Sequence, residues 1–188
     1  MQHERLVGFS RDWARPSRPR RVFYCRFLYG PVDVVGARGP ARPPEERLKA
    51  ARQFGEVQLL DARLVLGRGH LVSAAEHAER AIREGTNVAK SLAVEFVLYA
   101  SGERQIADAL AKVGIREDTT EFAVVLFGGG DVGATLRALS LERDDAVLEA
   151  SVSKLRAFGV TDTELASVPE DRQVDLILER VALVDLLK

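Results

Sequence analysis

Residues 88–100 constrain the fold more than any other segment, because they are apolar on nearly every side of a helix. A helix that is apolar all round is buried on most of its faces. The segment therefore predicts a helix at the centre of the fold, with Thr86 or Asn87 as its N-cap. The apolar run stops at Ser101 and Gly102, and a polar stretch follows at once.

Glu95 lies in the middle of this apolar run. A carboxylate in an apolar interior is costly unless it is paired or hydrogen-bonded. No histidine or second acid stands at a spacing that would make an acid–base pair with Glu95. We therefore interpret Glu95 as a structural buried carboxylate and predict no catalytic residue. A small enzyme that uses Glu95 for catalysis is the alternative.

The rest of the chain alternates between helix and strand patterns. We expect helices at 45–54, 70–84, 103–113, 132–139 and 172–187, strands at 22–29 and 121–127, one or two strands within 56–66, and a loop at 36–44. The run 121–127 is continuously apolar, which is typical of a strand in the middle of a sheet. Because the connections are not uniformly strand–helix–strand, we predict an α+β fold. A small mixed or mostly antiparallel sheet would pack against several helices.

The chain divides into residues 1–20 and residues 21–188. The longer part fits a single domain. The first 20 residues combine several arginines with two prolines. Charged, proline-containing termini rarely order themselves, so we expect a flexible basic arm. An arm that contacts the phosphates of a nucleic acid is the alternative.

Composition and charge exclude several classes of function. The formal net charge is −1, so a nucleic-acid binder has to rely on a local basic patch. The single cysteine rules out an internal disulfide, and no cysteines and histidines have the spacing of a metal site. The chain has neither the ~20 apolar residues of a membrane span nor the apolar core of a secretory signal. We therefore expect a cytoplasmic protein without cofactor, metal or membrane contact.

The polar stretch after Gly102 predicts a second helix with an exposed first turn. Backbone N–H groups of such a turn can donate to phosphate oxygens. Arg104 can pair with a phosphate, and Gln105 can read the edge of a base. Ile106 offers an apolar face to an unstacked base. A solvated helix start without a ligand is the alternative interpretation.

The stretch 87–106, NVAKSLAVEFVLYASGERQI, resembles the signature of the small non-catalytic subunit of the KEOPS complex, the archaeal relative of the PRPK-binding protein. The resemblance continues through 57–78 and 121–127 and covers most of residues 55–187. It implies a subunit that binds and stimulates the kinase-like ATPase of the complex, which makes threonylcarbamoyladenosine in tRNA. It also implies capture of the single-stranded 3′ CCA tail of tRNA. An activator of the kinase that never contacts RNA is the alternative.

Residues can also be assigned to the two partners, to the kinase from the apolar pattern of the last helix and to the tRNA tail from the resemblance. The last helix, 172–187, has more apolar positions than one buried stripe requires, so the kinase contact is predicted there, at Val181, Val184 and Leu187. The residues that would line or lie near the tRNA tail are Arg68, His70, Lys90, Ser91, Ser101, Gly102, Arg104, Gln105 and Ile106.

Overall fold

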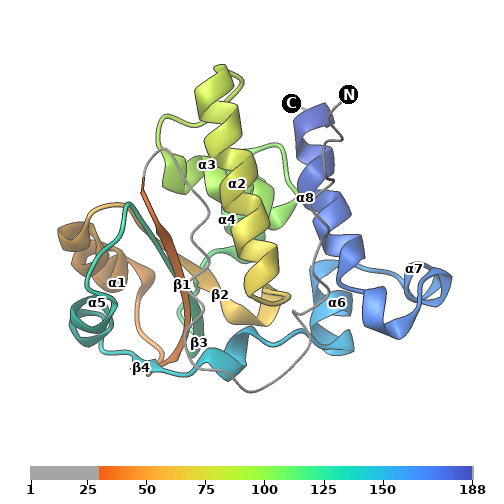
Figure 1. The fold of residues 1–188 in the computed structure, drawn as a ribbon. Helices are drawn as coiled ribbons and strands as arrows, with labels where there is room; N and C mark the ends of the chain where they lie inside the picture. The colour runs from red at the N-terminus through yellow and green to blue at the C-terminus, as the bar shows by residue number, and fades with distance from the viewer. Residues whose placement is uncertain (1–29, 188) are drawn as a thin grey trace, which may run out of the picture.

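The computed structural model describes residues 30–187 of the chain (Figure 1). The basic arm at 1–20 and the expected strand at 22–29 lie outside these residues. The described part contains a four-stranded sheet in the order β2-β3-β1-β4, and every pairing is antiparallel. The strands are β1 (Val32–Arg38), β2 (Val57–Asp61), β3 (Glu121–Phe127) and β4 (Glu142–Arg143). The predicted α+β fold with an antiparallel sheet is confirmed.

Helices cover both faces of this sheet. Figure 1 shows α2, α3, α4 and α8 on one side and α1 and α5 on the other. The α-helices are α1 (Pro44–Ala51), α2 (Arg68–Glu84), α3 (Leu92–Ser101), α4 (Ile106–Val113), α5 (Val132–Ala138), α6 (Val152–Phe158), α7 (Asp162–Ser167) and α8 (Asp175–Leu187). Short 3-10 helices lie at Arg52–Phe54, Ala62–Leu64, Asp145–Leu148 and Glu170–Arg172.

Strand β3 lies between β1 and β2, as its apolar run predicts. Its alternate side chains enter two different cores. Ala123, Val125 and Phe127 pack with the α2–α3–α8 side, whereas Phe122 and Val124 pack with the α1–α5 side. A strand buried on both faces has no polar side to present, which explains its continuous apolar sequence.

Helix α3 forms the centre of the larger core. Its residues are buried except for Val94, which is partly exposed. The predicted central helix is therefore confirmed, but its start is not. It begins at Leu92, where the Ser91 side chain accepts a hydrogen bond from the N–H of Val94. The preceding residues lie outside the helix because Ser91 has an extended backbone, with φ −122° and ψ 152°. The carboxylate of Glu95 accepts hydrogen bonds from the N–H groups of Val88 and Ala89 in this segment.

The loop expected at 36–44 is wrong for its first three residues, which continue β1 to Arg38. The glycine that indicated a loop, Gly36, serves a close approach instead. A Cβ at this position would lie 2.4 Å from the carbonyl oxygen of Asp144. Glycine in a strand often marks such contact with a neighbouring backbone.

Several helix or strand boundaries also differ from the sequence prediction. Helix α2 begins at Arg68 rather than at 70, and α1 ends at Ala51, where a 3-10 helix continues to Phe54. Residues 62–64 form a 3-10 helix rather than a second strand within 56–66. Helix α4 begins at Ile106 rather than at 103, and α8 begins at Asp175 rather than at 172.

Candidate functional site

The turn between α3 and α4, residues 101–105, ends one helix and presents the start of the next. Gly102 adopts a left-handed conformation with φ 70°. Its N–H donates to Tyr99 O at 3.2 Å, and the N–H of Glu103 donates to Leu98 O at 3.1 Å. This pair of bonds is typical of a helix that ends at a left-handed glycine. A side chain at Gly102 would strain the turn, so Gly102 is needed for this backbone conformation. The predicted contact of Gly102 with RNA could come only from its backbone.

Ser101 belongs to the same turn but is fully buried. Its Oγ donates to Leu98 O at 2.9 Å and accepts from the N–H of Glu103 at 3.1 Å. The hydroxyl therefore has both a donor and an acceptor role inside the protein. The prediction that Ser101 contacts RNA is wrong, because no part of its side chain reaches the surface.

Arg104 and Gln105 are exposed, and Ile106 is partly exposed at the first position of α4. Gln105 is the N-cap residue, yet its side chain makes no capping hydrogen bond. The N-terminal end of α4 is therefore open to an acceptor from outside the chain, although Asp108 adds a negative charge to its first turn. The sequence predicted the exposure of Arg104 and Gln105 but placed them in the first turn of a helix, whereas both precede α4.

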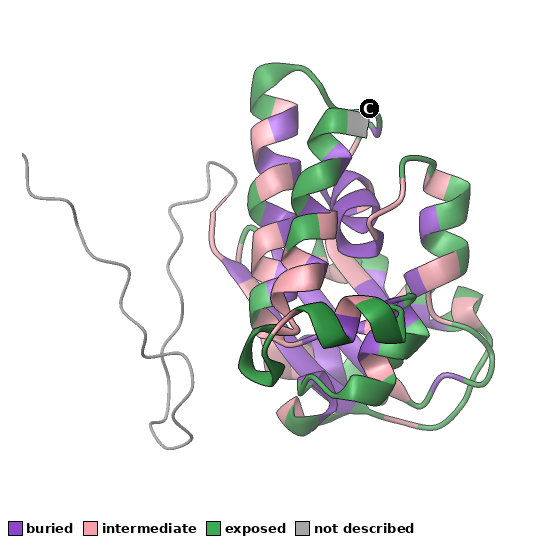
Figure 2. Ribbon diagram, turned by 90° about the vertical axis from the view of Figure 1, so that its right-hand side faces the viewer, coloured by how far each residue is buried: buried purple, intermediate pink, exposed green. Residues whose placement is uncertain are grey.

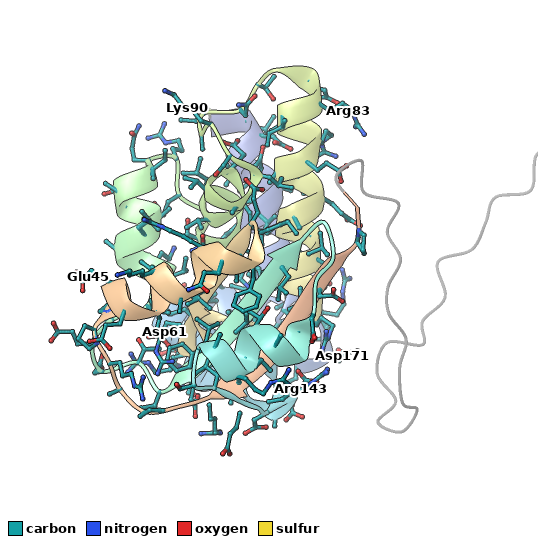
Figure 3. All side chains as sticks on the ribbon, turned by 90° about the vertical axis from the view of Figure 1, so that its left-hand side faces the viewer. Glu45, Asp61, Arg83, Lys90, Arg143 and Asp171 are labelled. Atoms are coloured by element: carbon teal, nitrogen blue, oxygen red, sulfur yellow. The ribbon has the colours of Figure 1, made fainter. Side chains whose placement is uncertain are left out.

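Lys90 and Ser91 lie at the opposite end of α3 from Arg104. Ten residues of helix separate them, a length of about 15 Å. Figure 3 shows Lys90 at the same end of the molecule as Arg83, where α2 finishes. Lys90 is exposed, while Ser91 is partly buried by its capping role. The structure therefore divides the predicted tail-binding set into two groups.

Arg68 is occupied by contacts within the protein at the start of α2. Its guanidinium donates to the carbonyl of Val34 in β1 and lies 3.4 Å from a carboxylate oxygen of Asp145. The side chain remains 41% exposed, so part of it faces solvent. Its main role in this geometry is to fasten α2 to the sheet.

His70 is buried beneath the α3–α4 turn. Its Nδ1 accepts from the N–H of Leu66 at 3.3 Å, and its Nε2 lies 3.0 Å from Ala100 O. The ring also packs edge-on against Phe158. Burial lowers the pKa of His70 to about 4, although the hydrogen bond to Ala100 acts in the opposite direction. The predicted RNA contact at His70 is wrong, because both ring nitrogens are used in the core.

Glu95 is also fully buried, as the structural interpretation requires. Its Oε2 accepts hydrogen bonds from the N–H groups of Val88 at 3.0 Å and Ala89 at 2.8 Å. A carboxylate enclosed in this way cannot meet a substrate. The enzyme alternative that relied on an accessible Glu95 is therefore excluded.

Helix α8 buries the residues that were expected to contact the kinase. Val181 and Val184 are 0% exposed and belong to the core with α2 and α3. A partner cannot contact them while the protein is folded, so this part of the prediction is wrong. The side chain of Leu187 is not among those described.

Asp185 fixes this orientation of α8. It accepts hydrogen bonds from Tyr99 of α3 at 2.5 Å and from Arg80 of α2 at 2.7 Å, and it contacts His77 at 2.8 Å. These three contacts with α2 and α3 fix the orientation of α8 against the core. The pKa of Tyr99 is raised by its burial and by this hydrogen bond to Asp185.

The other side of α8 exposes apolar residues that the sequence interpretation missed. Leu183 is 40% exposed and Leu186 is 79% exposed. Figure 2 looks onto the side of the molecule that carries α8 and shows exposed positions along the helix in green. The excess of apolar residues in α8 corresponds to this exposed stripe. Sequence alone could not tell which of its two stripes faces the core.

Two further features bear on the possible chemistry. Among residues 30–187, no group of three or more histidine, cysteine, aspartate or glutamate side chains could hold a metal ion. None of the helices in the described part of the chain combines the length and apolar character needed to cross a membrane.

Comparison with known proteins identifies the family. The family model of kinase binding protein CGI-121 matches residues 44–183, well over half of the chain. The chain belongs to the CGI-121 family. The expected resemblance to the small KEOPS subunit is thereby confirmed. The match includes the α3–α4 turn and most of α8, but β1 and Leu186 lie outside it.

Two relatives of this family show how far the similarity extends. Regulatory protein Cgi121 of Methanocaldococcus jannaschii is 27% identical over 164 residues, which cover 82% of this chain and 98% of that protein. EKC/KEOPS complex subunit CGI121 of Yarrowia lipolytica is 30% identical over 76 residues, covering 40% of this chain and 45% of that protein. Similarity to the archaeal relative therefore spans nearly its whole length.

Proposed function

We propose that this chain is a non-catalytic subunit of a KEOPS complex. It binds and stimulates the kinase-like ATPase subunit and holds the single-stranded 3′ CCA tail of tRNA during threonylcarbamoyladenosine synthesis in the cytoplasm. Membership of a kinase-binding family and the names of the two relatives support the first part. The exposed start of α4 supports the second.

The kinase-like subunit docks on the outer side of α8 in this proposal. Leu183 and Leu186 are exposed there, on a helix whose opposite side is anchored through Asp185. A leucine that is 79% exposed gains most of its burial free energy only when a partner covers it. A fixed helix also loses little conformational entropy on binding. These properties replace the buried valines as the basis for the contact.

The tRNA tail binds beside Arg104 and Gln105. The observation that carries this proposal is their joint exposure immediately before the uncapped N-terminus of α4. Arg104 pairs with a phosphate of the tail, the N–H groups of the first turn donate hydrogen bonds to a second phosphate, and Gln105 reads a base edge. Ile106 packs against an unstacked base. Lys90 lies too far along α3 for this cluster and would meet another part of the tRNA.

A charge reversal tests the RNA contact. Arg104→Glu places a negative charge where a phosphate is expected, so we predict at least about tenfold weaker binding of the isolated subunit to tRNA. Arg137→Glu is the matched control, since Arg137 is exposed in the last turn of α5 on the other side of the sheet. Equal loss of binding in both variants would show only a general effect of charge.

The second candidate is a kinase activator that does not contact RNA. The net charge of −1 favours it, because the chain as a whole exerts no attraction on a polyanion. Under this alternative, Arg104→Glu leaves tRNA binding unchanged, while stimulation of the kinase-like subunit persists.

A further inference from the structure

Lys112, in the last turn of α4, reaches back to the turn from which α4 starts. Its Nζ donates to Ser101 O at 2.8 Å and to Glu103 Oε1 at 2.9 Å. The same ammonium lies 4.3 Å from the centre of the Phe158 ring. The Lys112 side chain thus links two residues of the α3–α4 turn, Ser101 and Glu103, to Phe158 in the core.

The contact with Ser101 completes the end of α3. The last carbonyl groups of a helix have no partner within it and carry partial negative charge. His70 occupies the carbonyl of Ala100, and Lys112 occupies that of Ser101. Since the Lys112 side chain is only 26% exposed, its position is set by packing rather than by solvent.

The contact with Glu103 bears on the neighbouring arginine. Glu103 directly precedes Arg104 in sequence, and its side chain is 36% exposed. Without Lys112, this carboxylate would be free to repel a phosphate or to pair with the Arg104 guanidinium itself. Its ion pair with Lys112, at 2.9 Å, compensates this negative charge.

We infer that Lys112 is a positioning residue for tRNA-tail binding, which fixes the α3–α4 turn and neutralises Glu103 so that Arg104 remains available to phosphate. This inference rests on the proposed function of that turn. Lys112 acts through Glu103 and Ser101 and does not itself contact the RNA. We therefore expect the two residues to be coupled. The loss of tRNA affinity on removing Lys112 should depend on whether the carboxylate of Glu103 is present.

A double-mutant cycle measures this coupling in the full-length chain. Lys112→Met removes the charge but keeps an unbranched side chain over Phe158, and Glu103→Gln removes the carboxylate. Affinity for tRNA with an intact CCA end and the unfolding midpoint are measured for the wild type, both single variants and the double variant. We expect about three- to tenfold weaker binding for Lys112→Met, from an uncompensated charge within several ångströms of the phosphate.

Glu103→Gln is expected to bind at least as well as the wild type. The double variant is expected to recover to within about threefold of it, because the repelling charge is gone. If the double variant regains affinity for tRNA but not the wild-type unfolding midpoint, the effect of Lys112 on binding does not come from a general loss of stability. Unchanged affinity in Lys112→Met would overturn the inference, and so would equal weakness in the double variant, which would show that the effect of Lys112 does not depend on the charge of Glu103.

Failure of the underlying function gives a different result. If wild-type protein binds CCA-trimmed and intact tRNA equally, the tail site itself is rejected, and with it the role of Lys112. If the wild type distinguishes the two RNAs while Lys112→Met matches it, only the role of Lys112 is rejected.

Discussion

The Nε2 atom of His70 donates a hydrogen bond to the backbone carbonyl of Ala100 at 3.0 Å. The direction follows from the other ring nitrogen: Nδ1 accepts from Leu66 N–H, so Nε2 carries the proton. This bond fastens the beginning of α2 to the end of α3. It therefore helps to determine where the α3–α4 turn starts, although the imidazole is too deeply buried to contact a ligand.

Acid should destabilise the protein through His70. Its pKa is about 4 in the folded protein, against 6.5 for an unperturbed histidine, so folding disfavours the proton. The stability contribution is present above pH 6.5 and is lost as the pH falls from 6.5 toward 4. The loss amounts to about 3 kcal/mol of unfolding free energy. Chemical denaturation between pH 7 and 4 measures it.

His70→Gln is the control for that experiment, because glutamine has no proton to gain in this range. The variant should be less stable at pH 7 but should lose less stability on acidification. An identical pH dependence in both proteins would show that other groups cause the acid sensitivity.

Glu95→Ala should destabilise the fold without any effect specific to a ligand. It removes the acceptor for two backbone N–H groups, those of Val88 and Ala89, in a buried site. Unsatisfied buried donors and the lost side chain together cost about 2–4 kcal/mol. Urea unfolding measures the change, with Glu117→Ala at an exposed position as the control, expected within ~0.5 kcal/mol of wild type. A loss below ~1 kcal/mol for Glu95→Ala would contradict its structural role.

Leu186→Asp should break the kinase contact and leave the fold intact. Leu186 is 79% exposed, so the change in unfolding free energy should stay within about 0.5 kcal/mol. Binding to the purified kinase-like subunit should weaken at least about tenfold, since a charge would enter an apolar interface. Calorimetric titration of the two subunits checks this.

Val184→Ala provides the opposite pattern on the same helix. Its side chain is fully buried, so truncation should cost about 1–3 kcal/mol of stability and leave kinase affinity nearly unchanged. If Leu186→Asp binds the kinase normally, the outer side of α8 is not the docking surface.

The parts of the fold that sequence predicted correctly have local causes. The bounds of β3 follow from seven consecutive residues, Glu121–Phe127, and the end of α2 follows from Gly85, which adopts the left-handed conformation. Asp131 caps α5 through a hydrogen bond from Ala134 N. In each case the residues that decide the structure lie next to one another in the chain.

The errors have causes that the local sequence pattern does not show. Gly36 continues a strand because the backbone of Asp144 approaches it. Residues 88 and 89 stay outside α3 because Ser91 adopts an extended backbone, and the carboxylate of Glu95 accepts hydrogen bonds from their N–H groups. The sequence did not predict a role for Lys112, because its contacts with Ser101 and Glu103 depend on how α4 lies against the end of α3. The exposed character of Arg104 and Gln105 was predictable because a glycine break marks a helix start.

The most direct test of tail capture is binding of the purified subunit to one tRNA prepared with and without its 3′ CCA, at moderate salt. The account predicts that trimming the three nucleotides weakens binding at least about tenfold, because the contacts at Arg104 and Gln105 are lost. Equal affinity for the two RNAs would contradict it and would leave kinase activation without RNA contact as the function of the chain.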